Sequence, residues 1–333
     1  MNIAIDVMGG DKGSFELIKG ALSASAKGGF KVTLFGNEDE IREAVAQLDI
    51  NADYEIRDCK QVISMCDNPL CVIKDKKASS MAMALSAAAS GECDAVVSTG
   101  NSGALITGAT FIVKRIAGVK RPAFAPVLPS ASGAVMLLDA GANVEVRPEF
   151  LYQFGKMGSV YMEKVLGKKD PRVGLISNGK EEQKGTDLTK EARALMEKAD
   201  YNFIGYIEGN DIMTGGCDVA VTDGYTGNVL LKSVEGMGKL VSAKVKVMLT
   251  GNILRKIGAL FMLKGIKTFK KEFDAKQYGG AMILGARVPV IKAHGSADSG
   301  PFETAVMQAA KAAGEGICDT IAAAFSSETA EEK

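Results

Sequence analysis

Short turns rich in Gly, Asp, Asn, Ser and Thr carry most of the residues in this chain that could bind or transform a ligand. Each turn follows a short apolar run and precedes a helical pattern, and two copies resemble each other, AVVSTGNSGALI (95–106) and VAVTDGYTGNVLL (219–231). The other turns occur in IAIDVMGGDKG from Ile3, MLLDAGAN from Met136, VGLISNG from Val173 and VPVIKAHGS from Val288. In an open α/β sheet such turns meet at the carboxyl ends of the strands, where ligands bind and helix-start N–H groups favour an anion. The pattern therefore predicts an enzyme-like protein with a phosphate-sized anionic ligand.

Glycines in these turns let the backbone come close to a ligand, and the polar residues beside them can contact it. The predicted phosphate- and substrate-binding residues are Asp6, Gly9, Gly10, Asp11, Gly100, Asn101, Ser102, Gly103 and Gly227. Asn101, Ser102 and Asn228 stand where helices are expected to begin, so helix capping explains them equally well. Asp6 and Asp223, at strand ends, would orient a lysine or a turn, because a bare carboxylate there repels phosphate.

Four residues are candidates for the chemistry itself: Lys184, Asn228, His294 and Asp223. Lys184, in SNGKEEQKGTD directly after a strand, is the candidate cation, although a solvated loop lysine fits the same pattern. His294 follows a strand and precedes Gly-Ser, a common place for a site residue, and a structural histidine fits equally well.

Several familiar signatures are missing. The turn at 9–13, GGDKG, does not match G-x-G-x-x-G, and the chain has no G-x-x-x-x-G-K-[ST], so NAD and ATP are not the expected ligands. GNSGA (100–104) misses G-x-S-x-G by one place, and a Ser-His-Asp triad would have to use the only histidine. These absences disfavour an acyl-enzyme and favour direct attack by a bound oxygen nucleophile.

The amino-acid composition excludes further classes of function. Lys plus Arg equals Asp plus Glu at 40 each, so no global basic field for nucleic acid exists. Six cysteines with no C-x-x-C pair, and no secretory signal, favour free thiols in a reducing cytosol. A single histidine argues against a zinc site, and the apolar stretches near the basic region are too short to span a bilayer.

Strand-like and helix-like patterns alternate along the chain, which predicts an α/β fold with a doubly wound, largely parallel sheet. The expected strands are 3–8, 31–36, 53–58, 94–98, 134–139, 172–177, 203–207, 218–222 and 288–293. The expected helices are 14–27, 38–48, 76–90, 102–116, 149–166, 187–199, a long one from 228, and one near 300–325. The length fits one α/β unit over 1–333 or two sub-domains that share a cleft.

Positive and negative charges balance over the whole chain, but a segment at 245–273 is both basic and apolar. No acidic residue occurs between Glu235 and Glu272, whereas nine Lys and Arg do. The expected helical surface carries Ile253, Leu254, Ile257, Leu260 and Phe261, with Lys256 and Lys264 beside it. Such a pattern is typical of a helix that lies on an anionic membrane or docks an acidic partner. A core or dimer-interface helix with a solvated basic back is the alternative.

Taken together, these segments resemble the fatty acyl-carrier-protein:phosphate acyltransferases of bacterial phospholipid synthesis. The resemblance spans nearly the whole chain, through IAIDVMGGDKG, STGNSGALITG, RPAFAPVLPS, LLDAGAN, SNGKEEQKGTD, IEGNDI, TDGYTGNVLLK, YGGAMILG and IKAHGS. Ser14, where the family usually has proline, and the turn Ser177-Asn178-Gly179 are small departures that do not touch the proposed chemistry.

The resemblance implies transfer of a long-chain acyl group from acyl-carrier protein to inorganic phosphate, which gives acyl phosphate for phospholipid synthesis. It also implies a fold similar to isopropylmalate dehydrogenases and phosphotransacetylases, a homodimer and no organic cofactor. The protein would be cytoplasmic and would contact the inner face of the cell membrane peripherally through the basic segment.

Joined to the turn pattern, the resemblance predicts a mechanism. Phosphate, held by helix-start N–H groups and Lys184, attacks the thioester directly, while Asn228, with backbone N–H groups or His294, stabilises the oxyanion.

Three other functions fit part of the pattern. A phosphotransacetylase would move a short acyl group between phosphate and coenzyme A, and a peripheral membrane scaffold would catalyse nothing. A dehydrogenase, suggested by fold similarity alone, is disfavoured by the missing dinucleotide fingerprint.

Overall fold

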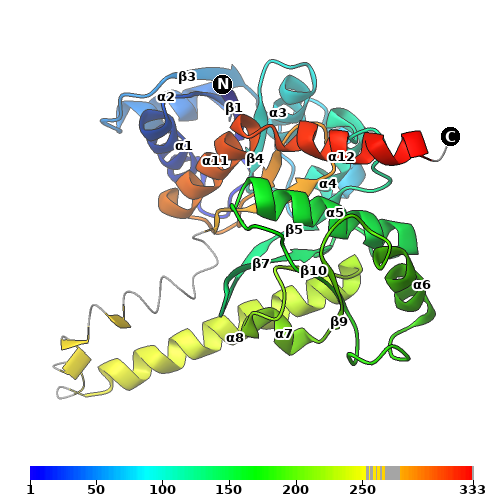
Figure 1. Cartoon of the computed structure of the whole chain (residues 1–333). Helices are drawn as coiled ribbons and strands as arrows, with labels where there is room; N and C mark the ends of the chain where they lie inside the picture. The colour runs from blue at the N-terminus through cyan, green and yellow to red at the C-terminus, as the bar shows by residue number, and fades with distance from the viewer. Residues whose placement is uncertain (253–254, 256–257, 260, 263–264, 267–277, 332–333) are drawn as a thin grey trace.

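The structure, a computed structural model, describes residues 1–252, 255, 258–259, 261–262, 265–266 and 278–331. Its strands form one sheet of seven strands and one of five, with helices packed around both (Figure 1). The larger sheet contains β1 (Asn2–Asp6), β2 (Lys31–Gly36), β3 (Tyr54–Asp58), β4 (Ala95–Ser98), β5 (Ala123–Ala125), β11 (Ala281–Leu284) and β12 (Val290–Lys292). The smaller sheet contains β6 (Val127–Ser130), β7 (Gly133–Leu138), β8 (Val173–Ile176), β9 (Phe203–Ile207) and β10 (Val219–Val221).

The helices connect and cover these strands. They are α1 (Ser14–Gly28), α2 (Glu38–Ala46), η1 (Pro69–Ile73), α3 (Ser80–Ala89), α4 (Ser102–Gly108), α5 (Pro148–Lys164), α6 (Asp187–Met196), α7 (Gly209–Thr214), α8 (Gly224–Thr250), α11 (Ser299–Gly314) and α12 (Ile317–Glu331). A π-helical stretch, η2 (Ala109–Val113), continues α4.

Most strand pairs are parallel, so the predicted α/β class with a largely parallel arrangement is confirmed. The larger sheet has the order β3-β2-β1-β4-β12-β11-β5, and only the pairs that involve β11 are antiparallel. The smaller sheet has the order β6-β7-β10-β8-β9, and only β6 runs antiparallel to its neighbour. The strands thus divide between two sheets, whereas the sequence pattern predicted one.

Three strands were not predicted, and two of them lie in a proline-rich stretch. The segment RPAFAPVLPS contains β5 and β6, and both form sheet edges, where proline is tolerated because no partner needs its N–H. The third, β11, is a four-residue apolar run that follows two glycines.

Several helix boundaries differ from the prediction for local reasons. The long helix α8 begins at Gly224 instead of 228, because Asp223 caps it by accepting a hydrogen bond from the Thr226 N–H. The predicted helix 102–116 stops at Lys114, whose φ of 73° is left-handed. The predicted last helix is divided at Gly316, with φ 59°, into α11 and α12.

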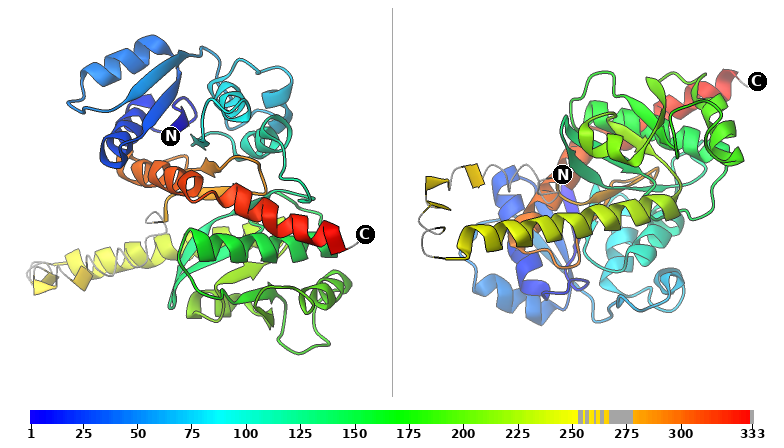
Figure 2. Two further views of the ribbon diagram at one scale, coloured as in Figure 1. Left: turned by 45° about the horizontal axis from the view of Figure 1, so that its top comes forward. Right: turned by 90° about the horizontal axis from the view of Figure 1, so that it is seen from below.

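One apolar core extends through both halves of the molecule. Its buried members include Ile3 and Ile5 of β1 as well as Leu175 of β8 and Val219 of β10. The C-terminal helix α12 packs against α5 of the other half. In contrast, α8 crosses the molecule and extends beyond its body (Figure 2). None of the described helices is both long enough and apolar enough to span a membrane.

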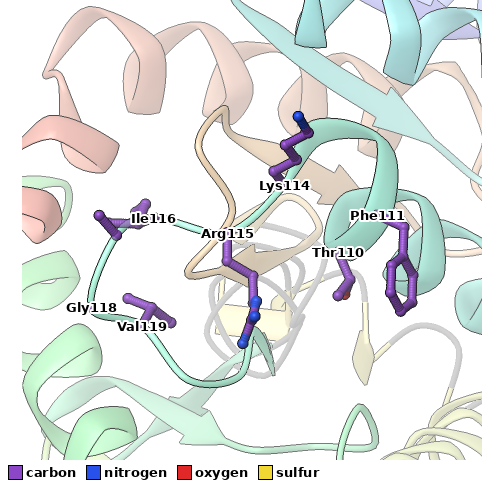
Figure 3. A pocket seen from close by; sticks show the side chains of 8 residues that line it. Thr110, Phe111, Lys114, Arg115, Ile116, Gly118 and Val119 are labelled. Carbon is purple, nitrogen blue, oxygen red and sulfur yellow. The ribbon is translucent and has the colours of Figure 1, made fainter.

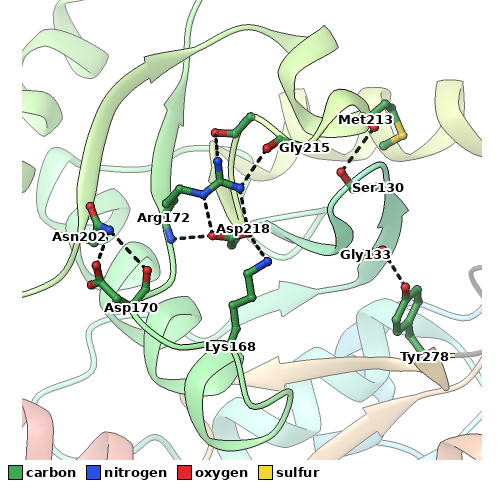
Figure 4. A network of polar contacts seen from close by, with 11 residues as sticks. Ser130, Gly133, Lys168, Asp170, Arg172, Asn202, Met213, Gly215, Asp218 and Tyr278 are labelled. Carbon is green, nitrogen blue, oxygen red and sulfur yellow. Dashed lines mark hydrogen bonds and ion pairs between the residues drawn. The ribbon is translucent and has the colours of Figure 1, made fainter.

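An ion-pair network around the buried Asp218 connects the amino ends of β8 and β10 (Figure 4). Arg172 donates to both carboxylate oxygens of Asp218, at 3.0 and 3.1 Å, and the Lys168 ammonium lies 3.0 Å from the same group. Burial raises the pKa of Asp218, but hydrogen bonds from Arg172 and Lys168 outweigh it, so the pKa lies below its usual value. Because this network is at the opposite ends of the strands from the ligand-binding turns, we interpret it as structural.

Candidate active site

Three polar residues lie side by side where the central strands of the larger sheet end. Asp6 of β1 pairs with Ser98 of β4, and Ser98 pairs with Lys292 of β12. The strand register alone therefore brings together residues that are far apart in sequence. This row stands at the carboxyl edge of the sheet, where α/β proteins bind ligands.

Asp6 is the buried anchor of the row. Its carboxylate accepts hydrogen bonds from the hydroxyls of Ser80 and Ser98, both at 2.7 Å, and from the Met8 N–H at 3.2 Å. Burial raises the pKa of Asp6, while these hydrogen bonds and the charge of Lys292 act in the opposite direction. The printed partners of the Asp6 carboxylate are thus two hydroxyls and one backbone N–H, and its predicted role of orienting a lysine or a turn stays a prediction.

Lys292 is a buried cation, with only 8% of the residue exposed. Its ammonium donates to the carbonyl oxygens of Thr99 (3.0 Å) and Ala293 (2.6 Å). An ammonium has three N–H donors, so one is left for a ligand. Burial lowers the pKa of Lys292 to about 8, although the charges of Asp11 and Asp6 act against it.

The glycine turns around this row interlock. A Cβ atom on Gly9 would lie 2.5 Å from the Gly100 Cα, so position 9 requires glycine for the two turns to touch. The Asp11 N–H donates to the Gly295 carbonyl at 2.9 Å, which ties the first turn to the one after β12. The three predicted turns therefore form one surface.

A buried hydroxyl in this surface lacks a protein partner. Thr99 Oγ1 makes no hydrogen bond with the described residues and lies 3.1 Å from the position of a Cβ on Gly10. Buried hydroxyls are nearly always satisfied, so this one calls for an explanation such as a ligand.

His294 lies at the same edge and is coupled to α8 from the other half. Its Nδ1 accepts a hydrogen bond from the Ser296 N–H at 3.2 Å and lies 3.0 Å from the Ser296 hydroxyl. Because Nδ1 is an acceptor, the ring proton is on Nε2. Partial burial lowers the pKa of His294; Glu235 opposes this, and Lys292, Lys232 and Lys239 reinforce it. A neutral histidine with an Nε2–H donor is therefore expected at neutral pH.

One face of α8 supplies the second wall. Asn228, Lys232, Glu235 and Lys239 follow one another at spacings of three or four residues, so they share a helix face. Lys232 lowers the pKa of both Lys292 and His294 by its charge, which locates this face beside the row. Lys292, Lys232 and the His294 imidazole therefore interact electrostatically across the two halves, together with the carboxylates of Glu235 and Asp11. The two ammonium groups and the imidazole N–H are the donors that an anionic ligand would use.

The first turn of α8 is packed tightly on the turn after β7. The Asp139 carboxylate accepts from the N–H groups of Phe124, Gly141, Ala142 and Asn143 and shapes that turn. Gly227 stands so close that a Cβ atom there would lie 1.9 Å from the Asp139 carbonyl oxygen. Because α8 begins at Gly224, Asn228 lies in its second turn and not at the helix start, where it was predicted. Its amide donates to the Ala140 carbonyl at 3.3 Å.

The remaining predicted residues have mixed surroundings. Asn101 caps α4 and donates to the carbonyls of Ser64, Met65 and Asp67, whereas Ser102 is exposed and Gly103 packs on Pro69. Asp223 is committed to capping α8.

Lys184 lies in the loop after β8, against Gly179, and no contact among the described residues joins it to Lys292 or His294. Its predicted role stays a prediction.

The basic, apolar segment at 245–273 is only partly described. Ile253, Leu254, Lys256, Ile257, Leu260 and Lys264 lie outside the described residues. Phe261 is described and is 88% exposed. In the described part of the chain, no group of three or more His, Cys, Asp or Glu side chains could hold a metal ion.

Sequence reasoning missed Lys292, Lys232 and Thr99. Lys292 was inside the predicted strand 288–293. Because lysine side chains are rarely buried, the sequence alone offered no reason to place this one inside the protein. The only available signal was the expectation that Asp6 would orient a lysine or a turn; the charge of Lys292 does act on Asp6, although its ammonium binds backbone carbonyls instead.

The chain was then compared with known proteins. The family described as fatty acid synthesis protein matches residues 1–320. A putative phosphate acyltransferase from Clostridium perfringens is 42% identical over 316 residues, and a phosphate acyltransferase from Bacillus pumilus is 43% identical over 311; each match covers 93% of both chains.

Solved structures share the fold. A phosphotransacetylase from Streptococcus pyogenes matches with a TM-score of 0.64 at 16% identity, over 95% of this chain and 94% of that one. A putative 4-hydroxythreonine-4-phosphate dehydrogenase from Salmonella typhimurium matches with a TM-score of 0.53 at 12% identity, over 93% and 99%. At these identities the likeness shows the fold alone.

Proposed function

Since the chain belongs to the fatty acid synthesis protein family, whose curated relatives are named phosphate acyltransferases, we propose that it moves a long-chain acyl group from acyl-carrier protein to inorganic phosphate. Phosphate-acyl transfer is the chemistry that these relatives share by name. The observation that carries the proposal is the buried Lys292 ammonium at the strand ends, which has one donor left and lies within electrostatic range of Lys232 on α8.

In the proposed reaction, phosphate binds between the two halves. The Lys292 ammonium and the His294 Nε2–H donate to its oxygens, and Lys232 adds positive charge from α8. A phosphate oxygen forms a bond to the thioester carbonyl carbon, the carbon–sulfur bond breaks, and the thiolate leaves and takes a proton from water. A cysteine-like thiol has a pKa near ~8.5, so the leaving group needs no strong acid.

Asn228 is proposed to stabilise the oxyanion that forms on the thioester carbonyl. Its amide lies on the α8 face that carries Lys232, one helical turn before it. The amide has a second N–H beside the one that it donates to Ala140.

We expect purified protein to form acyl phosphate from palmitoyl-carrier protein only when phosphate is present. Trapping the product with hydroxylamine measures it, and kcat/KM should exceed that for acetyl-coenzyme A by about 100-fold or more, because a long chain adds apolar contacts. A preference for acetyl-coenzyme A would instead establish the phosphotransacetylase function. No product from either donor would leave the scaffold function.

We further propose that the protein acts at a membrane surface, where a long-chain product would partition. Support comes from α8, which displays Val229, Met237, Leu240, Val247 and Met248 with more than half of each side chain exposed. These residues fall within one side of the helix, and the basic segment follows directly. The homodimer implied by the family resemblance stays a prediction.

Val247→Glu with Met248→Glu is expected to weaken binding to vesicles that contain anionic lipid by about tenfold, because two charges enter the apolar face. Ser242→Glu, on another face of α8, is the matched control and should bind nearly as wild type. Vesicle flotation measures binding, and light scattering follows the oligomeric state. A variant that becomes monomeric while it still binds vesicles would assign this face to the dimer interface.

A further inference from the structure

A basic groove, defined here as the space between residues 110–121 and residues 145–150, lies at the far end of α4 from Lys292. Two adjoining cavities of about 420 and 710 Å³ form it, and they share Thr110, Phe111 and Arg115. Figure 3 shows the residues that line the smaller one. One wall follows η2, and the other leads into α5. The groove therefore lies between the two halves of the molecule.

The charge of this groove is one-sided. Five cations line it, and Glu145 is its only acidic lining residue. None of the five has a carboxylate partner within 4.0 Å among the described residues, and all are exposed; they are Lys114, Arg115, Lys120, Arg121 and Arg147. On an ordinary protein surface, basic and acidic side chains are interspersed. This cluster therefore creates a local positive field in a chain with no net charge.

Hydrogen bonds fix the frame that displays these cations. The Gln153 amide bridges the loop, since its oxygen accepts from the Lys120 N–H (2.8 Å) and its nitrogen donates to the Gly118 carbonyl (3.0 Å). Arg287 donates to the Arg115 carbonyl at 3.1 Å and adds a sixth exposed cation nearby. These hydrogen bonds hold the backbone of the 114–121 loop, which carries four of the five cations.

Apolar side chains accompany the charge. Phe111 is 61% exposed in the groove, and Val144, just before the second wall, is 65% exposed. The Arg121 guanidinium lies 5.9 Å from the centre of the Phe150 ring. Cations around exposed apolar residues are typical of a protein-docking surface rather than of a site for a bare ion.

Both walls lead to the candidate active site. From Thr110 back to Ser102, along η2 and α4, the helical path is about 12 Å at 1.5 Å per residue. The other wall begins two residues after Asn143, whose carbonyl accepts from the Gly224 N–H at the start of α8. The start of α4 stands at the same sheet edge as Lys292, since β4 and β12 are parallel neighbours that end there.

We propose that the basic groove docks an acidic protein, the carrier that delivers the acyl thioester, with its tethered arm directed along α4 toward Lys292. This inference rests on the proposed function. A second copy of this chain is a poor occupant, because like charges would face each other across a two-fold axis.

The test is the double charge reversal Lys120→Glu with Arg147→Glu, compared with Lys190→Glu and Lys198→Glu on and beside α6. All four side chains are exposed and make no ion pair with the described residues, so folding should be unaffected. The groove variant should raise KM for palmitoyl-carrier protein by about tenfold or more at low salt, and wild-type KM should approach it as salt rises. Its kcat and its KM for phosphate should match the control.

Palmitoyl-coenzyme A separates the possible ligands. Its KM should change far less than that of the carrier, since the acyl chain and thioester arm are common to both donors. An equal rise for both donors would overturn the inference and assign the groove to the donor's phosphate groups, and an unchanged carrier KM would overturn it outright. Carrier without an acyl chain, followed by fluorescence anisotropy, measures docking even if wild type makes no acyl phosphate, so the inference and the proposed function can fail separately.

Discussion

Lys292→Met is expected to lower kcat/KM for acyl-phosphate formation by about 10- to 100-fold, because a hydrogen bond to a charged group contributes about 1.5–3 kcal/mol. Methionine keeps the length and apolar stem of lysine, so the substitution removes little besides the ammonium. It also removes the group that binds Thr99 and Ala293, whose carbonyls water can then satisfy. The loss should appear mainly in KM for phosphate, because the ammonium already binds the anion in the ground state.

The pH dependence of phosphate binding is the second readout of the same residue. Burial lowers the pKa of Lys292 from 10.5 to about 8, so the ammonium is charged below this pH and loses its charge above it. KM for phosphate in wild type should therefore rise by about tenfold per pH unit above roughly pH 8 and should lose this rise in the Met variant.

Stability has its own pH dependence. Between about pH 8 and 10.5 the unfolded chain binds more protons at Lys292 than the folded protein, so its contribution to stability increases with pH in that window.

Matched variants test whether the effect comes from the buried Lys292 ammonium. Lys232→Met removes an ammonium whose side chain is 62% exposed and paired with Glu235, so its effect should be much smaller. Lys292→Arg keeps a permanent charge and should bind phosphate without the break near pH 8. A Met variant that melts like wild type but keeps its KM for phosphate would remove Lys292 from the site. Lys184→Ala in the same assay tests the cation that the sequence pattern favoured.

The turns were predictable from sequence because their residues are local. Gly9, Gly100 and Asn101 stand in short motifs, and parallel strands must bring their carboxyl ends to one edge. The helix start at Gly224 was hidden because TDGYTG has the composition of a turn, whereas Asp223 makes it a cap. Local composition thus located the edge of the sheet but not every boundary.

Site residues that come together only through long-range strand or helix packing could not be predicted from the sequence. Lys292 meets Ser98 only through the register of β12 on β4, and no nearby sequence encodes that register. The basic groove collects cations from three separate places, near 114, 120 and 147, each of which is unremarkable alone. The coupling of Lys232 to His294 likewise depends on how α8 crosses between the halves.

Gly227→Ala is expected to destabilise the protein by about 3 kcal/mol, the upper part of the usual range for overpacking. The added Cβ would lie 1.9 Å from the Asp139 carbonyl oxygen and 2.9 Å from its carbon, so backbone rather than a flexible side chain must move. Asp139 cannot yield easily, because it is buried and its carboxylate accepts several N–H groups of its own turn. Thermal unfolding measures the change.

Gly238→Ala is the matched control, because a Cβ on this glycine in the same helix has no neighbour within 4 Å. It should be neutral or stabilise α8 by up to about 1 kcal/mol through helix propensity. The two variants also separate stability from geometry. If α8 must shift to accept a methyl group at Gly227, Asn228 and Lys232 move with it, so kcat/KM should fall below that of the Gly238 variant even at temperatures where both are folded. Equal activity of the two folded variants would mean that the start of α8 does not position the site.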